Sequence, residues 1–295
     1  MKKARYILEA ALLHALFFIF GLMPLDAASG CGGWIGRTVG PRLSASRKAL
    51  DHVRTALPGR GEQEYKAIVR GMWDNLGRVM AEYPHLKQIG RERVVIVNPE
   101  IVESVVRDKK PAIFITGHLA NWEAFAVAGQ IKLGLMADVV YRAPNNPWVD
   151  RLLDRVRSQG GKILTIPKSK SSVRTMIESL KQGHSLGMLI DQKYNEGLPV
   201  SFFGRPAMTS PAFVQLAQKF GCPLIPGRIE RLRGAHFRLT VYEPMKIFAA
   251  DGSPRKAEDV MEEAHRLLEA WINERPEQWL WLHRRWRAGA EADTV

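Results

Sequence analysis

Two candidate catalytic residues, His118 and Glu123, follow a short apolar run in the middle of the sequence. The run Ala112–Thr116 predicts a buried strand that ends at Gly117, so His118 stands at its carboxyl end, where open α/β sheets bind their ligands. With Asn121 as an N-cap, Glu123 falls in the first turn of the next helix, and the chain can fold back until the carboxylate holds the imidazole. Such a pair leaves the other ring nitrogen as a base for an alcohol substrate. The structural alternative is a capping histidine beside a glutamate that complements the helix dipole.

The elements that must position this pair alternate along the chain. Short β-rich runs follow one another with amphipathic helical patterns between them, which predicts an α/β domain with a mostly parallel central sheet flanked by helices. Strands are expected at 94–97, 112–116, 138–141, 162–166, 185–190, 224–230 and 236–242. Helices are expected at 62–83, 100–107, 122–131, 147–158, 172–181, 211–220 and 255–273.

The N-terminus has the most unusual composition. Ala10–Leu25 contains no charged residue, and Asp26 follows it directly. Together with Tyr6–Leu8 the stretch reaches about 20 residues, enough to cross a bilayer. We expect a membrane-anchoring helix in residues 1–28; a cleaved signal peptide and a buried core helix are the alternatives. A glycine-rich stretch then predicts a flexible joint at 29–43, ahead of the main domain at 44–288 and a tail at 289–295.

Charge and cysteine content narrow the class of protein. The chain has 43 Lys and Arg against 30 Asp and Glu, a net charge of +13, which favours anionic partners such as lipid headgroups, phosphorylated substrates, an acidic carrier protein or nucleic acid. Only Cys31 and Cys222 are present, which excludes a disulfide scaffold and a four-cysteine zinc site. No second histidine stands four residues from His118, and no metal is expected.

Five blocks of sequence together resemble a known family. The spacing His118-x4-Glu123 resembles the H-x4-D/E motif of membrane glycerolipid acyltransferases, and its Asn-Trp-Glu form resembles the late acyltransferases of lipid A biosynthesis. The further blocks are 140–147, 191–192, 202–207 and 276–285, in the family's order, so that the resemblance covers essentially the whole chain. Residues 193–195 and 197–199 depart from the pattern, which concerns the choice of acyl chain.

The resemblance implies a function and a location. The chain is expected to move a fatty acyl group from acyl carrier protein to a hydroxyl of a phosphorylated lipid A precursor, with His118 as the general base and Glu123 as the carboxylate that orients it. No covalent acyl-enzyme and no cofactor are required. The enzyme would lie at the cell inner membrane with its catalytic domain on the cytoplasmic face.

Four further residues are expected to bind substrate or shape the site. Arg142 ends a predicted strand and suits a phosphate or an oxyanion. In the family an arginine near the following helix organises the site, and we expect Arg155 in that role, with Arg157 as the alternative. Asp191 follows the strand 185–190 and is expected to pair with one of these arginines. The segment Trp279–Trp286, which alternates aromatic and basic residues, is expected at the bilayer surface.

Three other functions stay open at this point. The chain can be a related acyltransferase for another acceptor, such as a phosphatidylinositol mannoside or a glycerophosphate. It can be a basic, membrane-associated nucleic-acid-binding protein, although the apolar Ala10–Leu25 counts against that. It can also be a secreted lipoprotein that only binds its ligand.

Overall fold

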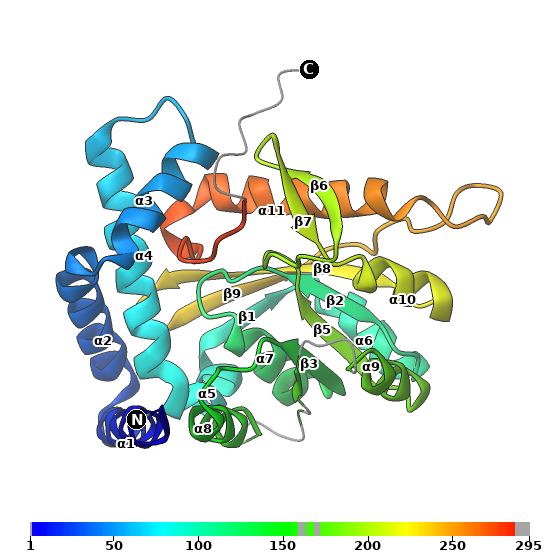
Figure 1. Ribbon diagram of the computed structural model, residues 1–295. Helices are drawn as coiled ribbons and strands as arrows, with labels where there is room; N and C mark the ends of the chain where they lie inside the picture. Colours follow the sequence, from blue (N-terminus) through cyan, green and yellow to red (C-terminus); the bar gives the residue numbers. More distant parts are fainter. Residues whose placement is uncertain (1, 159–162, 164, 168–171, 287–295) are drawn as a thin grey trace.

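A seven-stranded sheet runs through the centre of the molecule in the computed structural model, which describes residues 2–158, 163, 165–167 and 172–286 (Figure 1). The strand order is β1-β9-β8-β2-β5-β3-β4, and neighbouring strands pair in parallel except β8 and β9, which are antiparallel. The expected α/β class with a mostly parallel sheet is confirmed. The strands are β1 Val94–Val97, β2 Ile113–Thr116, β3 Ala137–Tyr141, β4 Thr165–Pro167, β5 Ser185–Leu189, β8 Leu224–Arg233 and β9 His236–Val241.

Helices cover both faces of the sheet, and a small hairpin stands apart from it. The expected helices are all present; the expected tail at 289–295 lies outside the described residues. The helices are α1 Lys2–Leu22, α2 Leu25–Val39, α3 Ala45–Ala56, α4 Glu62–Glu82, α5 Leu86–Gln88, α6 Pro99–Asp108, α7 Glu123–Leu133, α8 Pro147–Ser158, α9 Ser172–Lys181, α10 Ala212–Phe220 and α11 Ala257–Glu274, with the short turns η1 Gly40–Arg42, η2 Tyr83–His85, η3 Ile89–Arg93 and η4 Pro276–Gln278. The hairpin, which sequence patterns did not predict, joins β6 Leu198–Phe202 to β7 Arg205–Thr209. Its turn has positive φ at Phe203 and Gly204, as a tight two-residue hairpin requires.

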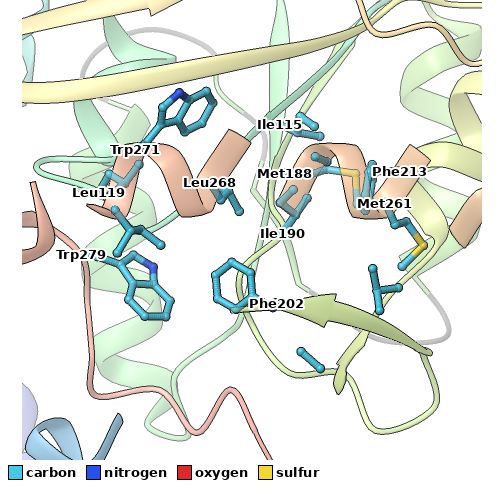
Figure 2. Packing of buried hydrophobic residues seen from close by; sticks show 14 of the residues in the cluster. Ile115, Leu119, Met188, Ile190, Phe202, Phe213, Met261, Leu268, Trp271 and Trp279 are labelled. Atoms are coloured by element: carbon cyan, nitrogen blue, oxygen red, sulfur yellow. The ribbon is translucent and has the colours of Figure 1, made fainter. Parts of the chain in front are cut away.

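The largest core lies between the sheet, α11 and this hairpin (Figure 2). Ile115 of β2 and Met188 of β5 face Leu268 of α11, and Phe202 of the hairpin closes the cluster from the other side. A second core packs α6 and α7 on the opposite face of the sheet. Strands buried on both faces explain the continuous apolar run of β2, whose four residues are all buried.

Residues 29–43 were expected as a flexible joint, but all of them up to Arg42 are helical. Gly32, Gly36 and Gly40 recur every four residues along one side of α2 and the turn after it, and this side packs on α4. A Cβ on Gly36 would overlap the backbone carbonyl oxygen of Trp73, and one on Gly32 would overlap that of Gly77. The glycines therefore serve the close approach of two helix backbones rather than flexibility.

Two other expectations concern membrane contact. α1 is long and apolar enough to cross a bilayer over Lys3–Leu22, by length and composition alone, and little of it is buried. It is compatible with the expected membrane anchor. The expectation for Trp279–Trp286 is wrong: Trp279, Trp281, Arg285 and Trp286 are all buried, so this segment belongs to the core and not to a bilayer surface.

Candidate active site

His118 lies in a loop that the C-terminal segment pins in place. The loop leaves β2 at Gly117 and turns at Ala120, which has φ +46°. The backbone carbonyl of His118 accepts a hydrogen bond from Leu280, and the N–H of Ala120 donates to the carbonyl of Gln278, at 3.2 and 2.9 Å. These bonds fix the backbone on either side of the histidine, which itself is buried.

The carboxylate that holds His118 is Asp191. His118 Nδ1 lies 2.8 Å from Asp191 Oδ1, and the backbone N–H of His118 donates to Oδ2 at 2.7 Å. Trp279 Nε1 adds a third hydrogen bond to Oδ2 at 2.8 Å. A carboxylate only accepts, so Nδ1 carries the proton and Nε2 is left as the basic nitrogen. Burial raises the pKa of Asp191, but the charge of His118 and its hydrogen bonds outweigh burial and hold that pKa well below its usual range.

The sheet explains why residues so far apart in sequence meet. β2 and β5 are parallel neighbours, with Thr116 opposite Leu189. Two residues beyond that register, His118 and Asp191 leave the two strands side by side at their carboxyl ends. The expected ion pair between Asp191 and an arginine is therefore wrong: among the described contacts, the carboxylate takes its hydrogen bonds from His118 and Trp279.

Glu123 forms a second buried cluster with Arg157. Arg157 donates to the carboxylate of Glu123 through Nε at 2.8 Å and Nη2 at 2.6 Å, while Tyr83 Oη and Trp122 Nε1 donate at 2.8 and 3.1 Å. The expectation that Glu123 holds the imidazole is wrong, because these donors occupy the carboxylate and His118 is not among them. Burial raises the pKa of Glu123, but the Arg157 charge and hydrogen bonds bring it below the usual value.

Both clusters face one pocket of about 420 Å³. Its lining combines polar side chains with apolar side chains of the sheet and α7. The polar members include His118, Glu123, Arg157, Tyr83, Arg142, Gln192 and His283, and the apolar members include Phe114, Phe125, Val139 and Met188. This size and mixed lining suit a ligand with a polar group and an apolar chain.

The arginines expected at the site separate into three environments. Arg157 is buried, and its Nη1 has no hydrogen-bond partner among the described residues. The Arg157 guanidinium therefore has one nitrogen, Nη1, that can donate a hydrogen bond to a ligand. Arg142 is exposed at the rim, where it lines both this pocket and a second, more polar one beside it. Arg155, the arginine preferred from the sequence, is exposed and does not line the pocket, so the expectation was displaced by two residues along α8.

Two residues of the site were not predicted, Gln192 and His283. Gln192 Nε2 lies 3.4 Å from Nε2 of both His118 and His283, and the two imidazole rings are 4.8 Å apart between centroids. Burial, with the charge of His118 as a second cause, lowers the pKa of His283 to about 4, so His283 is neutral at pH 7. Both residues fall in blocks that carried the family resemblance, at 191–192 and 276–285, which was the signal available.

No group of three or more His, Cys, Asp or Glu side chains within the described part of the chain is placed to hold a metal ion. Cys222 is buried, and burial raises the pKa of its thiol to about 11, which makes it a poor nucleophile. Among the described side chains that line the pocket, His118 is the histidine whose Nδ1 is held by a carboxylate and whose Nε2 is left as a base.

The fold and the site define an α/β protein in which a histidine, held by a buried aspartate, faces a pocket lined by polar and apolar side chains. A histidine held in this way is suited to taking a proton from a hydroxyl. The sequence model of the bacterial lipid A biosynthesis acyltransferases matches residues 1–288, and the chain belongs to that family. It is also similar to the lipid A biosynthesis lauroyltransferase of Escherichia coli (strain K12), with 25% identity over 282 residues, which covers 91% of this chain and 87% of the relative. The family resemblance read from the sequence is thereby confirmed.

Proposed function

We propose that this acyltransferase moves a fatty acyl group from an acyl carrier protein thioester to a hydroxyl of a phosphorylated lipid A precursor, with His118 as the general base. The observation that carries the proposal is the Asp191–His118 pair, with Nδ1 and Oδ1 2.8 Å apart, at a pocket lined by both polar and apolar side chains. The apolar lining residues receive the acyl chain, and the polar ones bring thioester and hydroxyl together.

In the reaction, Nε2 of His118 takes the proton of the acceptor hydroxyl as its oxygen attacks the thioester carbonyl carbon. A carbon–oxygen bond forms and the carbon–sulfur bond breaks. The imidazolium then gives its proton to the departing thiolate, so the products are the ester and the free thiol. Asp191 stabilises the imidazolium through Nδ1 without becoming protonated, as a carboxylate does behind a catalytic histidine.

Arg157 supplies the positive charge of the site. Its Nη1, which has no hydrogen-bond partner among the described residues, donates to the oxyanion that forms on the carbonyl, and Glu123 holds the guanidinium in place through two hydrogen bonds. Glu123 is thus a positioning residue that acts through Arg157. Arg142, exposed at the rim, is placed to bind a phosphate of the acceptor.

The proposed partners follow from the charge of the chain and from the acceptor. A net charge of +13 favours an acidic carrier protein and the anionic surface of a membrane. Because acyl carrier protein is cytoplasmic, the catalytic domain would lie at the cytoplasmic face of the inner membrane.

The test compares the lipid A made by cells that lack the protein and cells that express the parent chain or His118→Ala. Mass spectrometry should show one added acyl group with the parent chain and none with His118→Ala. A matched control is His184→Ala, which also removes a histidine paired with an aspartate (Nδ1 to Asp138 Oδ2, 3.1 Å) but lies outside the pocket and should restore the acyl group. Unchanged lipid A in the presence of the folded parent protein would overturn the proposed acceptor. With purified protein, transfer from acyl coenzyme A but not from the carrier thioester would overturn the proposed donor.

A further inference from the structure

Helix α1 contacts the catalytic domain near both of its ends. Near its beginning, Asn146 Nδ2 donates to the carbonyl of Tyr6 at 2.8 Å and to Glu9 Oε2 at 3.1 Å. Near its end, His85 Nε2 lies 2.9 Å from the carbonyl oxygen of Phe20. Figure 1 shows α1 beside α8 along one edge of the molecule, across the ends of α2 and α4. A helix of 21 residues is about 32 Å long, so α1 lies against the domain over most of that length.

The two sides of α1 have different surroundings. Ala10, Phe17 and Phe20 are buried against the domain, and the ring of Phe17 stacks on Tyr83 with centroids 5.4 Å apart. At 100° per residue, the outward side covers roughly half of the helix circumference and is almost entirely apolar. Its large side chains are strongly exposed, with Leu8 at 70%, Phe18 at 68% and Leu22 at 72%. A face of this kind is not stable in water and needs an apolar phase.

Polar groups along α1 argue against an upright, membrane-crossing orientation. His14, exposed, stands near the middle of the helix and would reach the centre of the bilayer, where ionisable side chains are costly. Asn146 binds α1 directly, and α8, which includes the charged Asp150 and Arg151, packs beside α1, so an upright α1 would bring these polar groups toward the hydrocarbon. With α1 in the membrane plane, these groups stay at the level of the headgroups, and the exposed Lys3 and Arg5 meet anionic lipid.

We propose that α1 does not cross the membrane but lies flat in one leaflet, with its Leu8–Phe18–Leu22 face in the acyl chains and both of its ends on the side of the catalytic domain. The partner of this surface is a lipid bilayer. The inference rests on the proposed function only in placing the enzyme at a membrane.

This orientation sets the pocket against the bilayer. Tyr83, which lines the pocket, stacks on Phe17 of α1, and Asn145 at the pocket rim precedes Asn146, which binds Tyr6. A lipid acceptor can thus move from the leaflet beside α1 into the pocket while its other acyl chains stay in the membrane.

The test uses cysteine labelling of the full-length chain in native membranes. In a background with Cys31→Ala and Cys222→Ala, single cysteines are placed at the start of α1 (Lys3→Cys), on its lipid face (Phe18→Cys) and on the exposed side of α10 (Lys219→Cys). A membrane-impermeant maleimide is added to spheroplasts and to inside-out vesicles, and retained acyl transfer shows that each variant is folded.

Lys3→Cys and Lys219→Cys should react in the same one of the two preparations. Phe18→Cys should react slowly in both and become reactive in detergent. Reaction of Lys3→Cys and Lys219→Cys from opposite sides would overturn the proposal, because α1 would then cross the membrane. Fast reaction of Phe18→Cys with the maleimide in intact membranes would also overturn the proposal. So would a Phe18→Cys that stays unreactive in detergent because a second copy of the chain covers it. If Lys3→Cys and Lys219→Cys both react only in spheroplasts, the flat orientation stands and the proposed cytoplasmic face is wrong.

Discussion

Replacing Glu123 with glutamine should lower both the free energy of unfolding and the rate of acyl transfer. The substitution leaves the Arg157 guanidinium, which is buried, without the carboxylate that now receives its 2.8 and 2.6 Å hydrogen bonds. Removing one partner of a buried ion pair costs about 3–5 kcal/mol. The lower end applies here, because Tyr83 and Trp122 can still donate to the glutamine oxygen.

A loss of about 3 kcal/mol corresponds to a fall in Tm of roughly 6–12 °C for a domain of this size. The assay is thermal unfolding in detergent, followed by circular dichroism, together with acyl transfer by the same samples. Arg157→Met should also be destabilised, since it leaves Glu123 buried without a cation.

The double variant Glu123→Gln with Arg157→Met separates structure from chemistry. It removes both charges, so its Tm should lie well above the value expected from adding the two single losses. Its activity should stay low, because the Nη1 donor to the oxyanion is gone. A Glu123→Gln protein with the parent Tm would refute the reasoning that Glu123 acts by holding Arg157, and an active double variant would refute the role of Arg157.

Two further predictions concern other parts of the fold. Gly36→Ala should lower the Tm, because its Cβ would overlap the carbonyl oxygen of Trp73, whereas Gly30→Ala, whose Cβ meets nothing within 4 Å, should not. Thermal unfolding of both variants checks this, and equal Tm values would contradict the close helix packing. The free energy of unfolding should fall as the pH drops from about 6.5 to 4. Burial and the charge of Arg285 lower the pKa of His265 in the folded protein to about 4. In this pH range the unfolded chain therefore binds a proton at His265 that the folded protein does not bind, which favours unfolding. The fall is about 3 kcal/mol for His265, at 1.4 kcal/mol per pH unit, and a slope unchanged in His265→Gln would rule this histidine out as its cause.

Local patterns in the sequence predicted most of the elements and one half of the site. The apolar run before Gly117 and the helix pattern from Trp122 place His118 in a loop at a strand end, where the structure has it. These features depend on residues close together in the chain. Periodicity and strand–helix alternation are sufficient for them.

The partner of His118 depends on strand order, which no local pattern contains. Asp191 reaches His118 because β5 lies next to β2 in a matched register, although the two residues are 73 positions apart in the sequence. Glu123, five residues away, was the nearer candidate by sequence and turned out to bind Arg157. The glycines of α2 show the same limit, since a glycine-rich stretch is compatible with a flexible joint and with close helix packing until the neighbouring helix is known.

The central claim is that His118, held by Asp191, removes the proton of the acceptor hydroxyl. The most direct test is kcat/KM for acyl transfer as a function of pH, with the carrier thioester and a lipid A precursor, for the parent chain, His118→Ala and the matched control His184→Ala. Loss of a general base commonly costs about 10²–10⁴ in rate, so His118→Ala should lose at least about two decades of kcat/KM, and its residual activity should not follow the pH profile of the parent chain. His184→Ala should keep the parent profile. Transfer by His118→Ala at nearly the parent rate, with the same pH profile, would contradict the account.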